Sequence, residues 1–289
     1  MPLVSMSGKM CIVTGANSGI GKETALGLAQ MGARVVMVCR NAEKGKAALE
    51  EIRRESGSSQ VDLLIADMSS QASVRALVEQ IQQKYPRLDV LVNNAGGAAP
   101  ARTLSADGIE MTLATNHLGA ALLTLLLLDL LKASAPSRIV NVSSSEAQHA
   151  RLDMNDLQFE RRKNRGVASY RQSKLLMNVF TFELARRLAG TGVTANCLHP
   201  GAVATNIWSA NPLPLIVKLI IAVVKPFMLS SKQGAAVSLY LATSPEVAQV
   251  SGEYFVKSKP AKSNPLSRDP KLMAEVWLWT EKMTSLPLA

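Results

Sequence analysis

Short apolar runs alternate with longer amphipathic stretches through the first two hundred residues. Six runs are rich in β-branched and other apolar residues, and they end at Gly15, Arg40, Asp67, Gly96, Ser144 and Gly201. Between them lie stretches with helical periodicity, such as GKETALGLAQMG and SVRALVEQIQQKY. Strands buried on both faces are continuous apolar runs, and their alternation with helices is typical of a parallel sheet covered on both sides. We therefore predict an α/β fold, a Rossmann-like doubly wound parallel sheet flanked by helices.

Residues 1–289 are expected to form a single domain, because no repeat, low-complexity segment or linker separates a second one. The segment at about 202–231 is irregular. Its stretch NPLPLIVKLIIAVVKPFML combines strong hydrophobicity with three prolines and with Lys218 and Lys225. The uninterrupted apolar part is shorter than the roughly 20 residues that a membrane-spanning helix needs. We interpret this segment as a buried or interfacial helix.

The composition is that of a globular protein, with 47% hydrophobic residues among 289, enough for a sizeable core. The formal net charge is +10, but aromatic residues make up only 4% and no run of five Lys or Arg occurs. No nucleic-acid partner is therefore expected. The positive charge is interpreted as solvated surface, which also attracts anionic cofactors or membrane surfaces.

Cysteine and histidine positions do not indicate a metal or redox centre. The cysteines lie in apolar, strand-like contexts without C-x-x-C spacing, and we expect buried thiols in a reducing compartment at Cys11, Cys39 and Cys197. The histidines are dispersed, so no zinc site is expected at His117, His149 or His199. The N-terminal residues lack the basic and apolar regions of a signal peptide. A cytoplasmic protein is the expectation.

A glycine-rich loop follows the first predicted strand. The sequence TGANSGIG places Gly15, Gly19 and Gly21 directly before the helical stretch KETALGLAQ. Glycines let the backbone turn tightly and approach a pyrophosphate, whose charge is favoured by the free N–H groups of the following helix. A glycine-rich turn without a ligand is the alternative. The order of strand, loop and helix favours a dinucleotide site.

Tyr170 and Lys174 are four residues apart in ASYRQSKLL, within an amphipathic helical pattern. Positions i and i+4 share one helix face, so both side chains can reach one pocket. An isolated pair with this spacing is usually a surface tyrosine beside a solvated lysine. Free tyrosine, with a pKa of about 10, is a poor base at neutral pH. In a functional pair, the Lys174 ammonium is expected to lower the pKa of Tyr170 and favour proton transfer.

Several motifs have the order and spacing of the short-chain dehydrogenase/reductase family, which this sequence resembles over about residues 8–206. They are T-G-x-x-x-G-x-G, NNAG at 93–96, TNHLG at 115–119, NVSSS after the fifth strand, the Tyr/Lys pair and HPGAVAT. The resemblance implies a nicotinamide cofactor. The positions that it implies for cofactor binding are Gly15, Asn17, Ser18, Gly19, Ile20, Gly21, Arg40, Lys44, Asp67, Asn94, Ala95, Gly96, Tyr170, Lys174, Pro200, Gly201, Val203 and Thr205.

The end of the second strand bears on the choice of cofactor. A carboxylate there binds the adenosine ribose hydroxyls, whereas an arginine attracts a 2′-phosphate. Here the strand ends in Cys39, Arg40 and Asn41, with no carboxylate. We predict a preference for NADP(H), with Arg40 as the phosphate partner and Lys44 as a second cation. A surface role for Arg40 is the alternative, and NAD(H) use stays open because Ser18 stands where some NADP-preferring relatives have a basic residue.

The resemblance also assigns catalytic roles. Lys174 would bind the nicotinamide ribose, Asn116 would hold a water of a proton relay, and Ser144 would donate a hydrogen bond to the substrate oxygen. Ser143 and Ser145 remain alternatives to Ser144. Asn116 has the alternative role of a helix cap, since an apolar helical stretch follows it.

The leucine-rich stretch at 121–131 is interpreted as a packed helix rather than a membrane element. In the family, the corresponding helix and the helix that carries Tyr170 commonly build a dimer interface. A homodimer is therefore an expectation from resemblance.

The sequence also resembles the retinol-dehydrogenase-like subgroup. The resemblance lies in the segments NVSSS, DLQFE and ELARRLAGTGVTANCLHPG and in the 25 residues between Ser144 and Tyr170. This implies an apolar aldehyde, ketone or alcohol substrate. Relatives often have an N-terminal membrane anchor, whereas this chain starts almost at the first strand, which argues against membrane-bound retinoid metabolism. Residues 212–229 occupy the position of a substrate lid, with a core or dimer helix as the alternative. Lys218 and Lys225 would share one helix face there, so a peripheral membrane contact is conceivable.

The sequence thus predicts an NADP(H)-dependent oxidoreductase that transfers hydride between the nicotinamide and an apolar carbonyl or alcohol. The alternative from another class is a dinucleotide-binding sensor without turnover. The complete set of Ser144, Tyr170 and Lys174 disfavours a sensor, which does not need a proton-transfer site. A sugar-nucleotide epimerase shares the Tyr/Lys chemistry, but the residues after Gly201 are too few for its larger substrate domain.

Overall fold

The apolar runs form the central sheet. The computed structural model describes residues 4–163, 166–203 and 228–286, and within them the sheet contains eight strands. The first six coincide with the six runs of the sequence. The strands are Met10–Thr14 (β1), Arg34–Cys39 (β2), Val61–Ile65 (β3), Val90–Asn93 (β4), Ser137–Val142 (β5), Val193–His199 (β6), Tyr254–Val256 (β7) and Lys259–Pro260 (β8).

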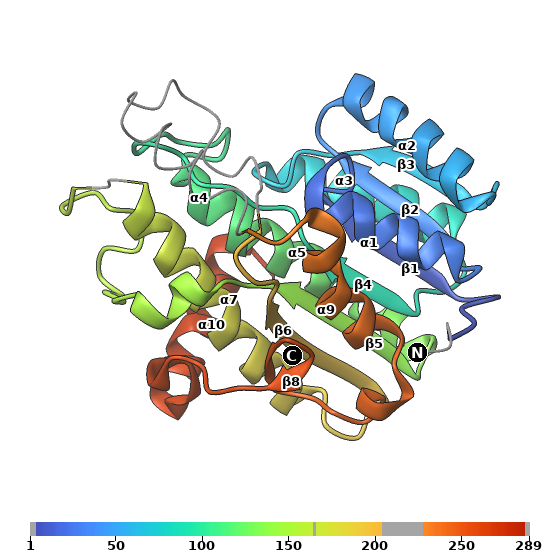
Figure 1. Ribbon diagram of the computed structural model, residues 1–289. Helices are drawn as coiled ribbons and strands as arrows, with labels where there is room; N and C mark the ends of the chain where they lie inside the picture. Colours follow the sequence, from blue (N-terminus) through green and yellow to red (C-terminus); the bar gives the residue numbers. More distant parts are fainter. Residues whose placement is uncertain (1–3, 164–165, 204–227, 287–289) are drawn as a thin grey trace.

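The strand order is β3-β2-β1-β4-β5-β6-β7-β8 (Figure 1). Neighbours from β3 to β7 pair in parallel, and β8 pairs with β7 in the antiparallel direction. The order reverses between β1 and β4, and α/β sheets bind ligands outside the carboxyl ends of their strands at such a point. The predicted doubly wound α/β fold is confirmed. The strands β7 and β8 were not predicted, because runs of two or three residues are too short to show a periodicity.

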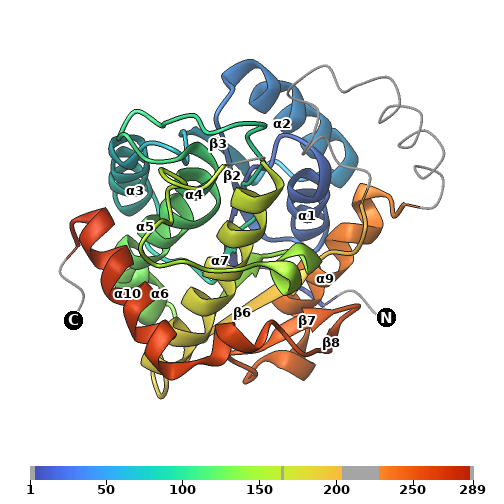
Figure 2. The same cartoon turned by 90° about the vertical axis from the view of Figure 1, so that its left-hand side faces the viewer.

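Helices cover both faces of the sheet (Figure 2). On one face lie Gly19–Gln30 (α1), Ala42–Ser56 (α2) and Ser231–Thr243 (α9), and on the other Gln71–Lys84 (α3), Gly119–Leu126 (α5) and Val167–Arg187 (α7). Shorter elements are Met111–Leu113 (α4), the π-helical turn Ala114–Leu118 (η1), Leu128–Ala133 (α6) and the 3₁₀ turn Ser145–His149 (η2). After α9 come the 3₁₀ turns Pro245–Val247 and Pro265–Arg268, and then Pro270–Thr284 (α10).

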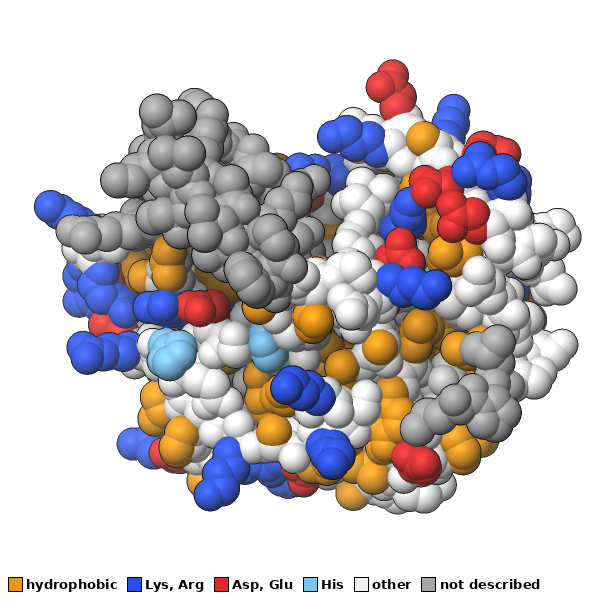
Figure 3. Space-filling view, in the orientation of Figure 1, with side chains coloured by type: hydrophobic (Ala, Val, Ile, Leu, Met, Phe, Trp, Pro, Cys, Tyr) orange, Lys and Arg blue, Asp and Glu red, His pale blue; other side chains and the backbone are white. Residues whose placement is uncertain are grey.

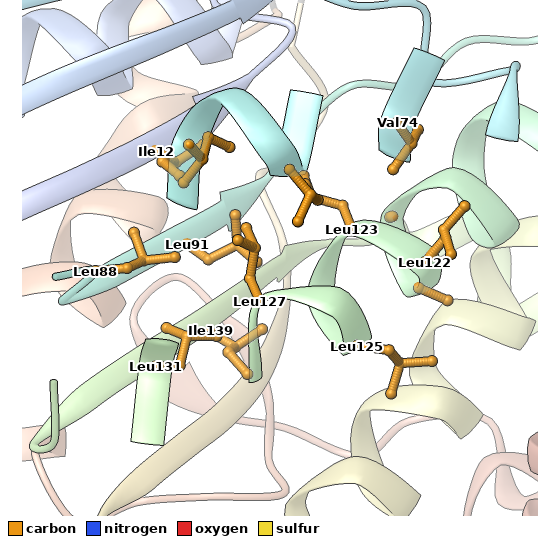
Figure 4. Packing of buried hydrophobic residues seen from close by; sticks show 14 of the residues in the cluster. Ile12, Val74, Leu88, Leu91, Leu122, Leu123, Leu125, Leu127, Leu131 and Ile139 are labelled. Atoms are coloured by element: carbon orange, nitrogen blue, oxygen red, sulfur yellow. The ribbon is translucent and has the colours of Figure 1, made fainter. Parts of the chain in front are cut away.

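The main core lies between the sheet and the helices α3 and α5. Ile12, Leu91 and Ile139 from three adjacent strands belong to one buried cluster with Leu122 and Leu123 of α5 (Figure 4). The leucine-rich stretch therefore packs inside the protein, as predicted. It is not one helix, because α5 ends at Leu126 and α6 begins at Leu128 after a residue with ψ near 2°. Across the described residues, no helix is long and apolar enough to cross a membrane.

The three cysteines are free and buried, as the sequence predicts. Burial raises the pKa of Cys11 and Cys197 strongly, and it raises the pKa of Cys39 to about 11. Thiols with such pKa values stay protonated at neutral pH and are poor nucleophiles. Their role is to fill the core.

Helix α10 packs against α7. Trp277 stacks on Phe180 with ring centroids 5.7 Å apart, and Trp279 stacks on His117 at 6.2 Å. His117 Nε2 and Thr280 Oγ1 are 3.1 Å apart. These contacts place the last helix of the chain beside the helix that carries Tyr170 (Figure 2).

This packing bears on the expected homodimer. Apart from Arg171, every residue of α7 from Ser169 to Ala185 is buried within one chain, and so is α5 from Gly119 to Leu125. The two helices that the resemblance assigns to a dimer interface are thus already covered. A homodimer stays a prediction, and it would require another surface or displacement of α10.

Positive charge is spread over the surface. On the face drawn in Figure 3, Lys and Arg side chains lie among acidic and uncharged ones and form no continuous stripe. Several basic side chains of the described chain form ion pairs, including Lys22 with Glu51 and Arg268 with Glu253. This pattern agrees with the interpretation of the net charge as solvated surface.

Candidate active site

The glycine loop joins the carboxyl ends of β1 and β4. Gly15 has a φ of +67°, a region that favours glycine. A Cβ atom at Gly21 would lie 2.3 Å from Asn94 Nδ2 and 2.4 Å from Gly15 O, so no larger residue fits there. Asn94 Nδ2 donates to Thr14 O at 2.8 Å. The structure therefore places Asn94 against the loop itself, where it holds the two strand ends together.

The first turn of α1 has an open N-terminus. Ser18 is the N-cap residue, but its side chain makes no capping hydrogen bond, and the first turn contains no acidic residue. Asn17 and Ser18 lie at the surface of this turn, and Gly19 has a φ of +57°. The free N–H groups and the positive end of the helix dipole favour an anion here. These residues fit the pyrophosphate of a dinucleotide.

Residues 200–203 of the HPGAVAT segment follow β6 and lead toward the same turn. Pro200 follows β6, and Gly201 turns the chain with a φ of +94°. Val203 then packs with Ile20 of α1 and Ala235 of α9 in a small buried cluster. The structure thus brings Val203, directly after Pro200 and Gly201, to Ile20 of the glycine loop. Thr205 and residues 204–227 of the predicted lid segment at about 202–231 lie outside the described residues.

Arg40 lies directly after β2, with 71% of its side chain exposed. Its Nη1 atom is 3.9 Å from Asp67 Oδ2, a weak surface ion pair. Asp67 Oδ1 accepts hydrogen bonds from the backbone N–H and the hydroxyl of Ser69. Lys44 is exposed in the first turn of α2, whose N-cap is Asn41. Arg40 and Asp67 therefore flank one place at the sheet edge, and the Arg40 guanidinium remains accessible to an anion.

Ser144 and Tyr170 form a hydrogen bond between their hydroxyl groups. Both are buried, with 9% of Ser144 and 6% of Tyr170 exposed. Ser143 Oγ instead donates to Lys174 O at 3.2 Å. The backbone N–H of Ser145 donates to His199 Nδ1. Of the three serines that the sequence left open, Ser144 is the one that meets the tyrosine.

Lys174 is a buried cation. Its Nζ atom donates to Val142 O at 2.8 Å and lies 5.7 Å from the centroid of the Tyr170 ring. Within the described chain, no carboxylate lies within 4 Å of it, and burial lowers the pKa of Lys174 to about 8. A Cβ atom at Gly96 would be 3.3 Å from Nζ. The NNAG motif and the Tyr/Lys pair therefore meet in one place.

The pKa of Tyr170 is raised, which is the opposite of the sequence prediction. Burial is the main cause, the carboxylate of Glu146 adds to it, and the hydrogen bond with Ser144 acts in the other direction. Lys174 lies beside the Tyr170 ring and donates to a backbone carbonyl, so its charge does not offset the rise in the Tyr170 pKa that burial causes. In the protein alone, the phenol is therefore held in its protonated form.

Asn116 lies inside the π-helical turn between α4 and α5, so the alternative role of a helix cap does not apply to it. Glu110 caps this helical run, because its carboxylate accepts the N–H of Leu113 at 2.8 Å. Asn116 Oδ1 accepts from Gly97 N, and Nδ2 donates to Gly97 O and to Ser173 Oγ. It thereby ties the loop after NNAG to the helix of Tyr170.

Three residues next to the site were missed in the sequence. Thr14 Oγ1 accepts hydrogen bonds from the N–H groups of Asn94 and Ala95 at 3.0 and 2.9 Å. Its signal in the sequence is its place as the first residue of the T-G-x-x-x-G-x-G motif. Glu146 pairs with Arg171 at 2.6 Å, one residue after Tyr170. No local pattern reveals that pair, because its members come from different elements.

Residues 156–162, from the 25-residue stretch between Ser144 and Tyr170, fold beside the first turns of α7. Asp156 is buried and accepts hydrogen bonds from Glu160 N, Arg162 N and Arg162 Nε. Gln172 of α7 donates through Nε2 to Leu157 O at 2.7 Å. These bonds attach the inserted stretch to the first turns of α7.

A groove of about 830 Å³ lies elsewhere, at the other end of α7, next to β7 and the start of α10. Its arginines are paired, Arg186 and Arg187 with Glu183 and Arg268 with Glu253. It contains none of the predicted site residues. The candidate active site is therefore the carboxyl edge of the sheet, where the glycine loop, Ser144, Tyr170 and Lys174 converge.

This fold and this site define a dinucleotide-dependent oxidoreductase, and the chain belongs to the short chain dehydrogenase family, whose family model matches residues 9–213. The family implies NAD or NADP as cofactor. The assigned residues fit that group, because the loop is glycine-only where it is tightest and the helix behind it is uncapped.

Within the family, the chain is similar to the retinol dehydrogenases. It is 43% identical to human retinol dehydrogenase 14 over 97% of this chain and 88% of that protein. Human retinol dehydrogenase 12 is 42% identical over 95% of this chain and 85% of that protein.

Solved structures have the same fold. The crystal structure of an uncharacterized protein from Mycobacterium paratuberculosis matches with a TM-score of 0.80 and 31% identity, covering 99% of this chain and 98% of that one. The NADP active-site complex of RhlG from Pseudomonas aeruginosa matches with a TM-score of 0.70 and 27% identity, covering 88% of this chain and 96% of that one.

Proposed function

We propose that the protein is an NADP(H)-dependent oxidoreductase that reduces an apolar aldehyde or ketone, or oxidises the matching alcohol. The observation that carries the proposal is the buried hydrogen bond between Ser144 and Tyr170, with the Lys174 ammonium beside the same ring, at the sheet edge that holds the glycine loop. The similarity to retinol dehydrogenases supports a retinal-like or retinol-like substrate.

When bound, the nicotinamide cofactor supplies or accepts the hydride. In reduction, the Tyr170 phenol donates its proton to the carbonyl oxygen, and the Ser144 hydroxyl donates a hydrogen bond to the same oxygen. Lys174 binds the nicotinamide ribose, and Asn116 is the proposed member of the relay that returns a proton to Tyr170. Burial and Glu146 raise the pKa of Tyr170, and the protonated phenol is the form that donates a proton in the reducing direction.

The preference for NADP(H) rests on Arg40. Its guanidinium is exposed at the end of β2, where a carboxylate would otherwise bind the ribose hydroxyls. Arginine binds phosphate through charge-assisted hydrogen bonds. The nearby Asp67 faces it at 3.9 Å with one carboxylate oxygen, while the other is occupied by Ser69.

The first test is consumption of NADPH and NADH by the purified protein, in parallel, with substrates from short aldehydes through retinal to steroid ketones. Turnover that is selective for NADPH and increases with the apolar length of the aldehyde supports the proposal. Tight cofactor binding without turnover of any substrate in this series would instead favour the dinucleotide sensor. Turnover that is equal with both cofactors would contradict the NADP(H) preference.

The cofactor assignment has its own variant test. Arg40→Ala is expected to weaken NADPH binding by about tenfold or more relative to NADH, because it removes a charged hydrogen-bond partner of the phosphate. Fluorescence titration with each cofactor measures the two dissociation constants. Lys46→Ala removes an exposed cation from the same helix region and serves as the control. Equal losses for NADPH and NADH in Arg40→Ala would remove the assignment.

A further inference from the structure

His199 is the last residue of β6, where the sheet ladder with β5 ends. The two strands pair in parallel up to Val142 and Leu198. Ser143 N then donates to Leu198 O at 2.8 Å. Beyond that bond the strands separate, and the N–H of Ser145 donates to His199 Nδ1 at 3.1 Å. The imidazole thus supplies the acceptor that a strand backbone would have supplied.

Ser144 lies between two anchored residues. On one side, Ser143 is held to the backbone of β6 and, through its hydroxyl, to Lys174 O at 3.2 Å. On the other side, Ser145 is held by His199. The Ser144 hydroxyl, which also accepts the N–H of Glu146 at 3.2 Å, lies between these anchors and beside Tyr170. Loss of one anchor would free the start of the η2 turn.

We propose that His199 is a positioning residue, which holds Ser144 in line with Tyr170 through the backbone N–H of Ser145. The proposal rests on the proposed oxidoreductase function. His199 need not touch substrate or cofactor for this role.

The bond is sensitive to protonation. An Nδ1 atom that accepts an N–H must carry a lone pair, so the neutral ring has its proton on Nε2. A second proton on Nδ1 would face the Ser145 N–H and break the bond. Glu146 from η2 favours this protonation, burial opposes it, and the net effect lowers the pKa of His199. Glu146 is itself paired with Arg171 of α7, Tyr170 is the titratable group on the same helix, and Val256 of β7 opposite His199 is apolar.

The test compares two variants of His199. In His199→Asn, an amide oxygen on Cγ replaces the Nδ1 acceptor and does not titrate, whereas His199→Leu removes the acceptor. We expect His199→Leu to lower kcat for NADPH-dependent aldehyde reduction by about 10²-fold. We expect His199→Asn to stay within about threefold of the wild type, since the acceptor is kept. His149→Asn, at an exposed histidine at the end of η2, is the control.

The pH profile separates positioning from a structural role. Wild-type kcat is expected to fall on the acid side, below the ordinary histidine pKa of about 6.5. His199→Asn should lack that fall, and His149→Asn should keep it. The proposal would be overturned if His199→Leu kept the wild-type kcat, or if the Leu and Asn variants lost kcat equally. It would also be overturned if kcat of His199→Asn still fell on the acid side as in the wild type.

A spectroscopic measurement keeps this test independent of turnover. In ¹⁵N-labelled protein, the amide resonance of Ser145 should follow the titration of His199, in the wild type and equally in Tyr170→Phe. If the chemical shift of the Ser145 amide did not change with the titration of His199, the proposed role of this hydrogen bond would be overturned. Absence of turnover in the wild type would contradict the proposed function, while the NMR result would still decide whether His199 holds the serine turn.

Discussion

The two ends of helix α7 bury charge in opposite ways. Near its start, Lys174 is buried with a backbone carbonyl as its hydrogen-bond partner, and burial lowers its pKa to about 8. Near its end, Glu183 is equally buried but is bonded to Arg186 and Arg187 at 2.7 Å. These bonds, chiefly that with Arg186, lower the pKa of Glu183 despite its burial.

The difference separates chemistry from packing on one helix. A buried charge without a counter-ion is costly for folding, and such groups are concentrated at functional sites. A buried charge with two arginines is neutralised within the fold. It is joined there by aromatic contacts, since Arg187 lies 4.2 Å from the Trp277 ring. We therefore expect variants at the start of α7 to alter turnover and variants at its end to alter stability.

The largest expected effect is on turnover at the start of the helix. Tyr170→Phe removes the proposed proton donor and should lower kcat by about 10³-fold, while unfolding free energy changes by about 1 kcal/mol. Steady-state kinetics and urea unfolding measure the two quantities. Residual activity within tenfold of the wild type would show that Tyr170 is not the donor.

The next effect is on stability at the other end. Trp277→Ala should lower the unfolding free energy by about 3 kcal/mol, because Trp277 is 3% exposed and stacks on Phe180. Leu278→Ala is the control on the same helix, since that side chain is 62% exposed, and it should change stability by about 0.5 kcal/mol or less. The kcat of folded Trp277→Ala should remain near the wild-type value; a large loss of kcat there would break the division between the two ends.

The two buried charges should change stability in different pH ranges, and each should make stability rise with pH because both folded pKa values are lowered. The folded pKa of Lys174 is below its ordinary value, so the wild type carries the penalty of the buried charge below about pH 8 and loses it as the pH rises toward 10.4. Relative to Lys174→Met, the wild type should gain on the order of 2 kcal/mol between pH 7 and 10. Denaturant unfolding at several pH values measures this difference. A difference that does not change with pH would contradict a buried ammonium.

For Glu183 the trend lies on the acid side. Its folded pKa is also lowered, so its stabilisation is present above the ordinary glutamate pKa of about 4.3 and is lost as the pH falls through the folded value. Glu183→Gln should cost about 2 kcal/mol at pH 7. The cost should shrink on acidification, as measured by the same unfolding experiment. A cost that is constant from pH 7 to pH 3 would argue against the charged pair.

The smallest effect distinguishes the two arginines. Arg187 bonds to Glu183 and also covers Trp277, whereas Arg186 is the more exposed partner, with 65% of its side chain accessible. Arg187→Ala should therefore cost about 1 kcal/mol, and Arg186→Ala should cost less. Thermal unfolding of the two variants in parallel measures the order. The reverse order would mean that the stacking of Arg187 on Trp277 adds nothing to the unfolding free energy.

Much of the fold could be predicted because its signals are local. The six apolar runs match β1 to β6, and the glycine loop lies between β1 and α1 as its sequence indicates. The meeting of Gly96, Ser144, Tyr170 and Lys174 follows from the rule that carboxyl ends of parallel strands share one edge. The split of the leucine-rich stretch at Leu127 and the short strand β7 were not predictable, since neither leaves a periodic pattern.

Other features depend on residues far apart in the chain. The direction of the Tyr170 pKa shift reverses the expectation because burial, a property of the whole fold, exceeds the influence of one neighbouring lysine. Asn116 resembles a helix cap in sequence, but it lies within a π-helical turn and bonds to Gly97 and Ser173. The resemblance indicated Ser144 among three serines, and the hydrogen bond between Ser144 and Tyr170 of α7 agrees with that choice.

The sequence by itself determined the order of strands and helices, the glycine loop and the spacing of the tyrosine and lysine, because each is encoded within a few consecutive residues. The tertiary structure alone decided that His199 accepts the N–H of Ser145 beside Ser144, and that α10 covers α7. Burial, long-range hydrogen bonds and packing arise only when distant segments meet, so no local pattern specifies them.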